Sequence, residues 1–278
     1  MKGIGGFYYV SDEEGSVHEC KARGRFRKEK MKPMVGDLVD FADLSGYSSI
    51  EEILPRKNAM KRPAVANLDR MLLVLSAGKP MPDLLLADKL LIQAKQSGIH
   101  PVIVINKTDM DFQYAQELEK QYAYYDTILT SAKDHEGIDL LEEKIRGKCV
   151  CLAGQSAVGK SSLINRLDES FGLETGGLSK KTDRGKHTTR QAELFYVENC
   201  DAYVVDTPGF SMFEMNLNKD EIAGYYPEFC TFGKQCRFIS CLHDREPDCG
   251  VKQAVETGEI NRERYERYLR IIHSLEEK

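Results

Sequence analysis

Residues 154–161 read Gly-Gln-Ser-Ala-Val-Gly-Lys-Ser, which places a lysine and a serine directly after a glycine-rich turn. In such a loop, glycines let backbone N–H groups surround an anion, and the positive end of the following helix stabilises it. Lys160 is then expected to reach the outer phosphates of a nucleotide, and the Ser161 hydroxyl to reach Mg²⁺. The sequence therefore predicts a phosphate-binding loop, in which Lys160 is also catalytic, formed by Gly154, Gln155, Ser156, Ala157, Val158, Gly159, Lys160, Ser161 and Ser162.

A second candidate follows the apolar run 202–205, where the chain reads Asp206-Thr207-Pro208-Gly209. The Asp206 carboxylate is expected on the Mg²⁺ side of the site, and the Gly209 N–H at the terminal phosphate. Taken alone, this motif is an ordinary turn. Because it follows the phosphate-binding loop at a plausible distance, the two together indicate nucleotide hydrolysis.

Two further motifs point to the base of the nucleotide. Residues 106–109 read Asn-Lys-Thr-Asp after the apolar run 101–105, and residues 131–133 read Ser-Ala-Lys. A carboxylate only accepts hydrogen bonds, and guanine offers two donors where adenine presents an acceptor at N1 and no 2-amino group. A site built on such bonds rejects an analogue that lacks the donors by roughly 10⁴-fold. The sequence therefore predicts GTP and GDP as ligands, with base contacts from Asn106, Lys107, Asp109, Ser131, Ala132 and Lys133.

These motifs need a sheet to bring them together. Near-continuous apolar runs at 71–77, 101–105, 149–153 and 202–205 are typical of parallel strands buried on both faces. Helical stretches such as 83–96 alternate with them, which predicts an α/β domain. Each motif lies at the end of a strand, where an open α/β sheet binds its ligand.

The order of the motifs is unusual, because base recognition precedes the phosphate-binding loop. Ordinary small GTPases have the reverse order. Cutting and rejoining such a sheet changes the chain order but leaves the site intact, so we interpret the domain as a circularly permuted GTPase. After residues 206–209 the chain continues into a C-terminal module instead of into base recognition.

That module contains three thiols and one imidazole at close spacing, in Cys236, Cys241, His243 and Cys249. Cys₃His is a closed tetrahedral set for structural Zn²⁺, and its binding energy can fold a segment too short to bury a core of its own. Cys230 is close enough to compete as a ligand, and a group of thiols without metal is the alternative interpretation. The remaining cysteines lie in or beside strands and are most simply core residues.

The N-terminal residues read as short strands separated by turns, as in a small barrel. Seven basic residues crowd residues 21–32 around Phe26, and four arginines crowd residues 262–270. The first group could bind nucleic acid, with a basic groove for the phosphates and aromatic side chains that stack on the bases. The alternative is that it forms a solvated loop. The second either faces RNA or forms the charged side of an amphipathic helix. The net charge of −5 argues against indiscriminate nucleic-acid binding.

The sequence also limits where the protein can act. No apolar run approaches the ~20 residues of a membrane span, and residues 1–7 do not resemble a signal peptide. We therefore expect a cytoplasmic protein without membrane contact. Two rival function classes are a nucleotide-binding module with a vestigial site and a GTP-dependent factor that modifies or binds tRNA. The intact motif residues argue against the first, and the closed Cys/His set leaves no second catalytic group for RNA modification.

The permuted order, the Cys/His cluster and residues 62–69 together resemble the circularly permuted small-ribosomal-subunit biogenesis GTPases, the RsgA (YjeQ or YloQ) family. The resemblance covers nearly the whole chain. It implies an N-terminal OB-fold, GTP hydrolysis stimulated by the 30S subunit during its late maturation, and contacts with 16S rRNA. It also leaves Cys230 out of the zinc site.

The resemblance assigns residues 185–189, Gly-Lys-His-Thr-Thr, to a switch segment. Thr189 is favoured as a Mg²⁺ ligand and catalytic residue, with Thr188 as the alternative. Familiar GTPases orient the attacking water with a glutamine after their D-x-x-G motif, whereas this chain has Phe210. The resemblance suggests His187 for that role once the ribosome orders the switch; otherwise His187 is a solvent-exposed switch residue.

The expected fold is thus a circularly permuted α/β P-loop GTPase domain with an N-terminal OB-fold barrel and a C-terminal zinc-binding helical domain. Expected boundaries are 1–63 for the RNA-binding barrel, 64–217 for the GTPase domain and 218–278 for the zinc-binding domain. The expected ligands are GTP or GDP, Mg²⁺ and one structural Zn²⁺. The protein is expected to be a monomer.

Overall fold

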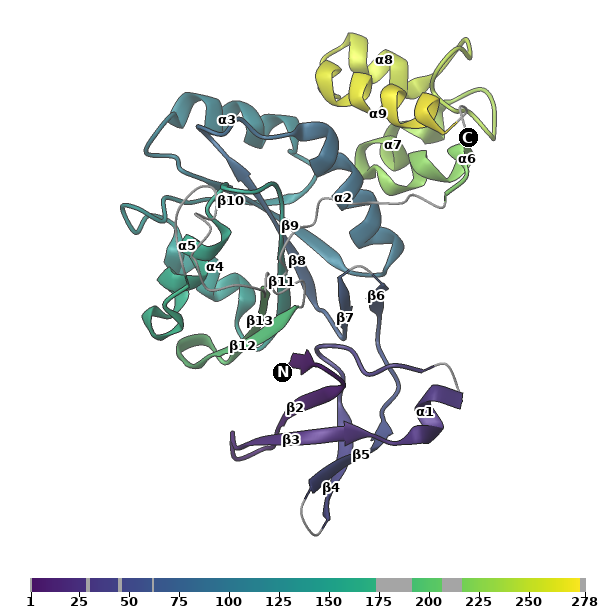
Figure 1. The fold of residues 1–278 in the computed structure, drawn as a ribbon. Coiled ribbons are helices and arrows are strands. Elements are labelled where there is room, and N and C mark those ends of the chain that lie inside the picture. The colour runs from purple at the N-terminus through teal and green to yellow at the C-terminus, as the bar shows by residue number, and fades with distance from the viewer. Residues whose placement is uncertain are drawn as a thin grey trace, which may run out of the picture.

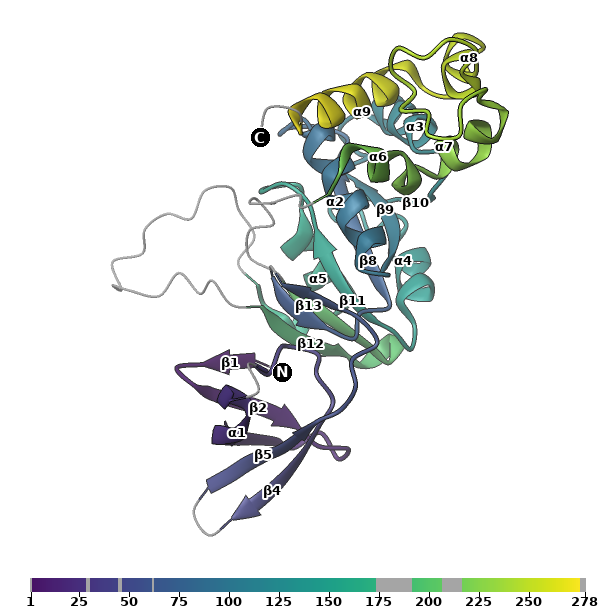
Figure 2. The same cartoon turned by 90° about the vertical axis from the view of Figure 1, so that its right-hand side faces the viewer.

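A computed structural model of the protein describes residues 2–28, 31–44, 47–61, 63–173, 192–206 and 217–275. Three units follow one another along the molecule (Figures 1 and 2). A small β-barrel lies at one end, an α/β unit in the middle, and a group of helices at the other end.

The central unit is built on a six-stranded sheet. The strand formed by residues 149–153, which leads into the phosphate-binding loop, is an inner strand of this sheet. The order of the sheet is β10 (Asp126–Leu129), β9 (His100–Asn106), β8 (Arg70–Ser76), β11 (Cys149–Ala153), β13 (Ala202–Asp206) and β12 (Glu193–Val197). Five strands run parallel, and β12 pairs with β13 in the antiparallel sense at the edge. The apolar runs of the sequence form β8, β9, β11 and β13, as predicted.

Helices cover both faces of this sheet. Successive residues of β8 alternate between two cores: Leu73 and Leu75 face one, and Leu72 and Val74 face the other. One core is closed by α2 (Leu84–Gln96) and α3 (Phe112–Gln121), the other by α4 (Ile138–Ile145) and α5 (Lys160–Leu167). The side chain of Asp83 caps α2 by accepting a hydrogen bond from the N–H of Leu86. Burial on both faces explains why the strands are almost uniformly apolar.

The chain order of the sheet is permuted. Strands β8 to β10 precede β11 in the sequence, yet β11 lies between β8 and β13 in space. The strand ends that carry the predicted base and phosphate motifs therefore meet at one edge. The predicted fold class is confirmed for this unit.

The N-terminal barrel has the topology of an OB-fold. Its strands lie in the order β1 (Lys2–Ile4), β2 (Phe7–Ser11), β3 (Val17–Ala22), β5 (Tyr47–Ile53) and β4 (Val39–Leu44). β3 and β5 are parallel, and α1 (Gly24–Lys28) connects β3 to β4. The core contains Cys20, Ile50 and Phe26, which is only 4% exposed. Phe26 is therefore unavailable for stacking on nucleic acid, and that prediction was wrong for this residue.

A two-stranded ladder links the barrel to the central sheet. It pairs β6 (Ala59–Lys61) with β7 (Ala64–Ala66) in the antiparallel sense. The side chain of Asn58 both donates to the Leu68 carbonyl and accepts from the Leu68 N–H. Asn67 likewise accepts from the N–H of Lys57 and donates to the carbonyl of Gly36. The side-chain amides of Asn58 and Asn67 therefore stabilise the connection through hydrogen bonds to the backbone on both sides of the ladder.

The C-terminal unit is helical and has its own core. It contains α6 (Lys219–Ile222), α7 (Pro227–Phe232), α8 (Gly250–Glu256) and α9 (Arg262–Ser274). Asn261 caps α9 by accepting a hydrogen bond from the N–H of Arg264. Two short 3₁₀ helices, η3 (Ala223–Tyr225) and η4 (Gly233–Gln235), belong to this unit. Two others, η1 (Glu169–Phe171) and η2 (Glu198–Cys200), belong to the central unit. Among the described residues, no helix is long and apolar enough to cross a membrane.

Candidate functional site

The loop between β11 and α5 is shaped by two glycines. Gly154 has φ +132°, and a Cβ there would lie 2.4 Å from the carbonyl oxygen of Val74. Gly159 has φ +103°, and a Cβ there would lie 2.2 Å from Nδ2 of Asn106. Both positions therefore exclude a side chain on steric and conformational grounds. Ser156 and Ala157 lie at the exposed tip of the loop.

Lys160 begins α5 and points back over this loop. Its Nζ donates to the carbonyl oxygens of Gly154 and Gln155, at 2.9 and 2.7 Å. Burial lowers the pKa of Lys160, and the nearby Asp206 carboxylate partly opposes this shift. A partly desolvated ammonium at a helix N-terminus attracts anions more strongly than one in bulk water. Ser161 and Ser162 occupy the first turn of the same helix.

Asn106 connects the predicted base motifs to the phosphate-binding loop. Its Nδ2 donates to the carbonyl oxygen of Val158 at 3.0 Å, and its Oδ1 accepts from the N–H of Ala132 at 3.1 Å. Lys107 adds a second link, because its Nζ donates to the carbonyl oxygen of Ala157 at 2.8 Å. Burial also lowers the pKa of Lys107. The three sequence motifs thus form one hydrogen-bonded unit.

Asp109 lies at the predicted base-binding position with both carboxylate oxygens engaged. Oδ1 accepts from Oγ of Ser131 at 2.8 Å, and Oδ2 lies 3.6 Å from Nζ of Lys133. The side chain of Asp109 is 12% exposed. A cavity of about 520 Å³ opens beside it, lined among others by Asp109, Lys133, Gly159 and Ser162. Its walls therefore come from both base motifs and from the phosphate-binding helix.

Arg166 is a residue of this cavity that the sequence did not single out. Its Nε donates to the carbonyl oxygen of Ala132 at 2.6 Å, and its Nη1 lies 2.9 Å from Nε2 of His135. A longer bond of 3.4 Å joins Nη2 to the Lys133 carbonyl oxygen. Arg166 therefore holds the 131–133 loop against α5. The only signal in the sequence is its place one turn after the lysine and serines of the phosphate motif.

Asp206 ends β13, which pairs directly with β11, so it lies next to the strand that leads into the phosphate-binding loop. The remaining predicted site residues lie outside the described residues. These are Thr207, Pro208, Gly209 and Phe210 of one segment and Gly185, Lys186, His187, Thr188 and Thr189 of the other.

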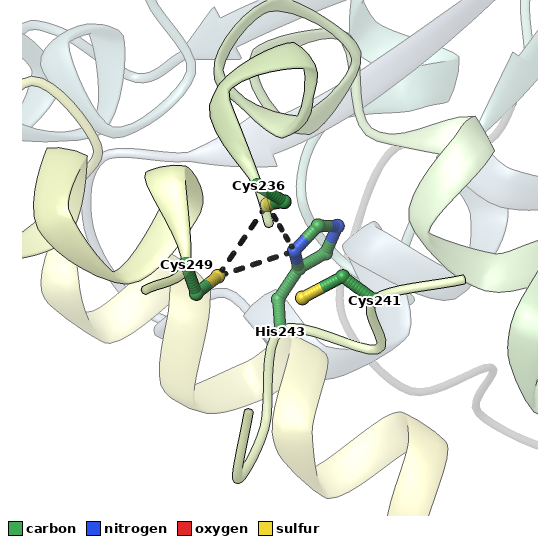
Figure 3. A group of neighbouring side chains, drawn as sticks. All are labelled: Cys236, Cys241, His243 and Cys249. Atoms are coloured by element: carbon green, nitrogen blue, oxygen red, sulfur yellow. Dashed lines mark hydrogen bonds between the residues drawn. The ribbon is translucent and has the colours of Figure 1, made fainter. Parts of the chain in front are cut away.

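The four predicted metal ligands converge in the C-terminal unit (Figure 3). One ligand atom from each of Cys236, Cys241, His243 and Cys249 lies within 4.8 Å of all the others. The Sγ atoms of Cys236 and Cys249 are 3.7 Å apart, and they lie 3.5 and 3.4 Å from Nδ1 of His243. Cys230 is exposed and outside this cluster, where its thiol donates to the carbonyl oxygen of Gly224.

Neighbouring groups hold these ligands in place. Sγ of Cys249 accepts from the N–H of Lys252 in the first turn of α8, a position where helix N–H groups favour negative charge. Tyr265 of α9 donates from its hydroxyl to the carbonyl oxygen of His243 at 2.7 Å. Burial lowers the pKa of His243, which favours the neutral imidazole that metals require.

A buried group of charges joins the C-terminal unit to the central one. Arg264 of α9 pairs with Asp88 of α2 at 2.5 Å and also with Glu228 of α7. Nε of Arg267 lies 2.7 Å from the other oxygen of Asp88. Burial by itself would lower the pKa of Arg264, but the nearby carboxylates of Glu228 and Asp88 have the larger effect and raise this pKa. Arg264 and Arg267 therefore neither face RNA nor form the charged, exposed side of the helix, which were the two alternatives predicted from the sequence. The sequence interpretation missed their role in this buried cluster.

The permuted sheet, the phosphate-binding loop and the adjoining base motifs define a circularly permuted P-loop GTPase. The RsgA GTPase family model matches residues 53–216, and the RsgA N-terminal domain model matches residues 1–48. The chain belongs to the RsgA GTPase family and is a GTP-hydrolysing enzyme.

Several relatives are similar to this chain over its whole length. A protein of Ruminiclostridium cellulolyticum named small ribosomal subunit biogenesis GTPase RsgA is 44% identical over 284 residues, covering 100% of this chain and 93% of its own. A Geobacillus kaustophilus protein of the same name is 43% identical over 288 residues, covering 100% and 97%.

Solved structures are similar as well. The crystal structure of YjeQ from Thermotoga maritima has 40% identity and a TM-score of 0.82, covering 98% of this chain and 95% of its own. The crystal structure of YloQ, described as a circularly permuted GTPase, has 34% identity and a TM-score of 0.79, covering 99% and 93%.

Proposed function

We propose that this protein hydrolyses GTP during the late maturation of the 30S ribosomal subunit, and that the subunit stimulates its turnover. The observation that carries the proposal is the 44% identity, over 100% of this chain, with a relative named small ribosomal subunit biogenesis GTPase. Contacts with 16S rRNA through the barrel and the C-terminal unit are part of this proposal. A cytoplasmic monomer fits such a role.

The nucleotide site follows from the hydrogen-bonded unit around Asn106. Asp109 and the 131–133 loop would bind the guanine edge in the adjoining cavity, and the N–H groups of residues 154–161 would bind the phosphates. Lys160 would exchange its two loop carbonyls for phosphate oxygens. Support comes from the short links of Asn106 to Val158 and Ala132, which keep base and phosphate sites in one frame.

The hydrolysis step requires charge neutralisation and an oriented water. Ser161 and Asp206, with Thr189 or Thr188, would hold the Mg²⁺ that neutralises charge on the outer phosphates. Gly209 would donate its N–H to the terminal phosphate, and His187 would orient water once the ribosome is bound. A partner that completes the site accounts for the absence of glutamine at Phe210.

The Cys/His cluster would hold one structural Zn²⁺. With bonds of about 2.3 Å to sulfur and about 2.0–2.1 Å to nitrogen, tetrahedral geometry spaces two sulfurs by about 3.8 Å and sulfur from nitrogen by about 3.6 Å. The measured separations of 3.7, 3.5 and 3.4 Å fit these values. Four protein ligands leave no open position, so the ion would stabilise the fold and take no part in hydrolysis.

We also propose the domain boundaries 1–63, 64–217 and 218–278. The first lies between the paired strands β6 and β7, and the second at the N-cap Asn218 of α6.

The decisive experiment measures GTP turnover by the full chain across a range of 30S concentrations, with 50S subunits and total tRNA as controls. We expect roughly 10⁻⁴ s⁻¹ alone and a stimulation of about 10³- to 10⁵-fold, the scale for GTPases completed by a partner. Fast turnover without ribosomes, or stimulation by tRNA alone, would contradict the proposal. The second outcome would favour a factor acting on tRNA.

A further inference from the structure

The side chain of Gln155 joins the phosphate-binding loop to the start of α2. Its Oε1 accepts a hydrogen bond from the N–H of Asp83, the N-cap of that helix, at 2.8 Å. The backbone carbonyl oxygen of Gln155 accepts from Nζ of Lys160 at 2.7 Å. Gln155 therefore contacts both the cap of α2 and the lysine that is expected to bind the outer phosphates.

The loop and the first turn of α2 are in close contact. The space that remains between them has a volume of about 10 Å³, and its lining includes Gly154 and Gln155 of the loop and Leu86 and Ala87 of the helix. A cavity of that size is at the lower limit for one water molecule. A movement of the loop at Gln155 must therefore either displace α2 or break the hydrogen bond to Asp83.

One face of α2 packs against the C-terminal helices, which lie beside it in both views (Figures 1 and 2). Leu85, Asp88 and Ile92 recur at intervals of three and four residues, the spacing of one helix face. Leu85 and Ile92 pack in the core of the C-terminal helices, and the two oxygens of Asp88 pair with Arg264 and Arg267 of α9. Asp88 is five residues after the N-cap, which is about 7.5 Å along a helix. The same short helix therefore contacts the phosphate-binding loop and α9.

The buried charges between α2 and α9 are incompletely paired. Nη2 of Arg267 and Oε2 of Glu228 are buried, and neither has a hydrogen-bond partner among the described residues. Buried polar groups without partners cost free energy, so an arrangement that pairs them competes with the one observed. The contact between α2 and α9 is therefore suited to two arrangements that a small movement of α2 can exchange.

We propose that Gln155 is a positioning residue through which the C-terminal helices control the affinity of the nucleotide site. A bound nucleotide would take Lys160 from the Gln155 carbonyl, and the loop would then shift α2 through the hydrogen bond to Asp83. Because coupling between two sites is reciprocal, a partner that binds the C-terminal helices and shifts α2 must change nucleotide affinity. This route does not use the chain connection after Asp206. The inference rests on the nucleotide site of the proposed function and adds a means of regulating that site.

A double-mutant cycle on the full chain tests the coupling, with affinity measured by titration of a fluorescent GDP analogue. Arg267→Lys keeps a positive charge beside Asp88 but loses the planar guanidinium group. It should change GDP affinity by roughly 3- to 30-fold, the range for substitutions that alter coupling between sites. In the Gln155→Ala background, Arg267→Lys should change affinity by less than about twofold, the error of additive pairs. Equal effects in the two backgrounds, or no effect in either, would overturn the inference.

Two matched controls accompany the cycle. Arg270→Lys alters an exposed arginine of the same helix and should leave GDP affinity unchanged in both backgrounds. Ser156→Ala alters the exposed neighbour of Gln155 in the loop and should preserve the effect of Arg267→Lys. If Ser156→Ala removes that effect as fully as Gln155→Ala does, the coupling belongs to the loop as a whole and the role of the Gln155 side chain is refuted.

Hydrogen exchange gives a second measurement, which a loss of affinity cannot mimic when GDP is saturating. GDP should change the exchange of backbone amides in α9 of the unmodified protein, and should leave them unchanged in Gln155→Ala. Amides of α5, which follows the phosphate-binding loop, should respond to GDP in both proteins and confirm saturation. Equal responses of α9 in the two proteins would show that nucleotide binding reaches the C-terminal helices by another route.

Failure of this inference and failure of the proposed function give different results. If the unmodified protein binds GDP and the two substitutions act independently, the role of Gln155 alone is wrong. If the substitutions are coupled but the 30S subunit has no effect on turnover, the ribosomal function fails and Gln155 keeps its role. If the unmodified protein does not bind GDP, the nucleotide site is wrong and the inference fails with it.

Discussion

Nε of Arg166 lies 2.6 Å from the carbonyl oxygen of Ala132, a bond that joins the phosphate-binding helix to the loop proposed to bind guanine. The two residues come from α5 and from the chain after β10. A charged donor that holds a loop in place typically contributes about 1.5–3 kcal/mol. The position of the loop therefore depends on a side chain outside the sequence motifs.

Arg166→Ala should weaken GDP binding by roughly 10-fold, because about 1.4 kcal/mol of loop positioning corresponds to one decade in affinity. The loss should be larger for GDP than for a ligand that lacks the base, such as triphosphate. Titration with a fluorescent guanine nucleotide measures it. Arg146→Ala, which removes an arginine bonded to the Asn199 carbonyl, is the control and should leave affinity unchanged. An unaltered affinity in Arg166→Ala would disprove the positioning role.

Lys160→Ala should abolish measurable GTP binding, because it removes the ammonium that donates to the Gly154 and Gln155 carbonyls and is expected to bind the outer phosphates. Calorimetry with GTP and Mg²⁺ checks this. Lys89→Ala on α2 is a control for the loss of a lysine. Retention of tight GTP binding by Lys160→Ala would mean that the phosphates lie elsewhere.

Asp109→Asn should shift preference from guanosine to xanthosine nucleotides, because the amide offers a donor where xanthine presents a carbonyl oxygen. A loss of roughly 10²-fold or more for GDP is the scale of a buried polar mismatch. Competition between GDP and xanthosine diphosphate gives the ratio directly. If the ratio does not change, Asp109 does not bind the base.

Cys241→Ser should reduce bound zinc from about one ion per chain, because three ligands cannot close the tetrahedral site. Elemental analysis of the purified protein measures the ratio. Cys230→Ser is a matched control, since this exposed thiol lies outside the cluster. Full zinc content in Cys241→Ser, or equal loss in both variants, would contradict the assignment.

Asp88→Asn should destabilise the protein by about 3–5 kcal/mol, because it leaves the buried Arg267 without its carboxylate partner and leaves Arg264 with Glu228 alone. Denaturant unfolding measures the change in free energy. Asp139→Asn, at the start of α4 away from this cluster, is the control and should have an effect below about 1 kcal/mol. A change in Asp88→Asn as small as in the control would show that the cluster contributes little.

The glycine-rich turn and the Cys₃His cluster could be predicted, because each lies within a short stretch of sequence whose geometry is local. The order and burial of the strands followed from their apolar runs, since burial on both faces leaves little choice of residue. The contacts of Arg264 could not be predicted, because Asp88 is 176 positions away in the chain. Phe26 was misassigned because its basic neighbours suggested an exposed loop, whereas the short helix α1 turns its ring into the barrel core.

The buried charges between α2 and α9 also determine whether the C-terminal helices can be removed from the rest of the protein. Asp88 has no exposed side-chain surface, and Ile92, one turn later on α2, belongs to the core of the C-terminal helices. A chain cut after residue 217 would remove both arginine partners of the buried Asp88 and uncover Ile92. The sequence boundaries suggest a detachable module, but because of these buried contacts we expect the central unit and the C-terminal helices to unfold together.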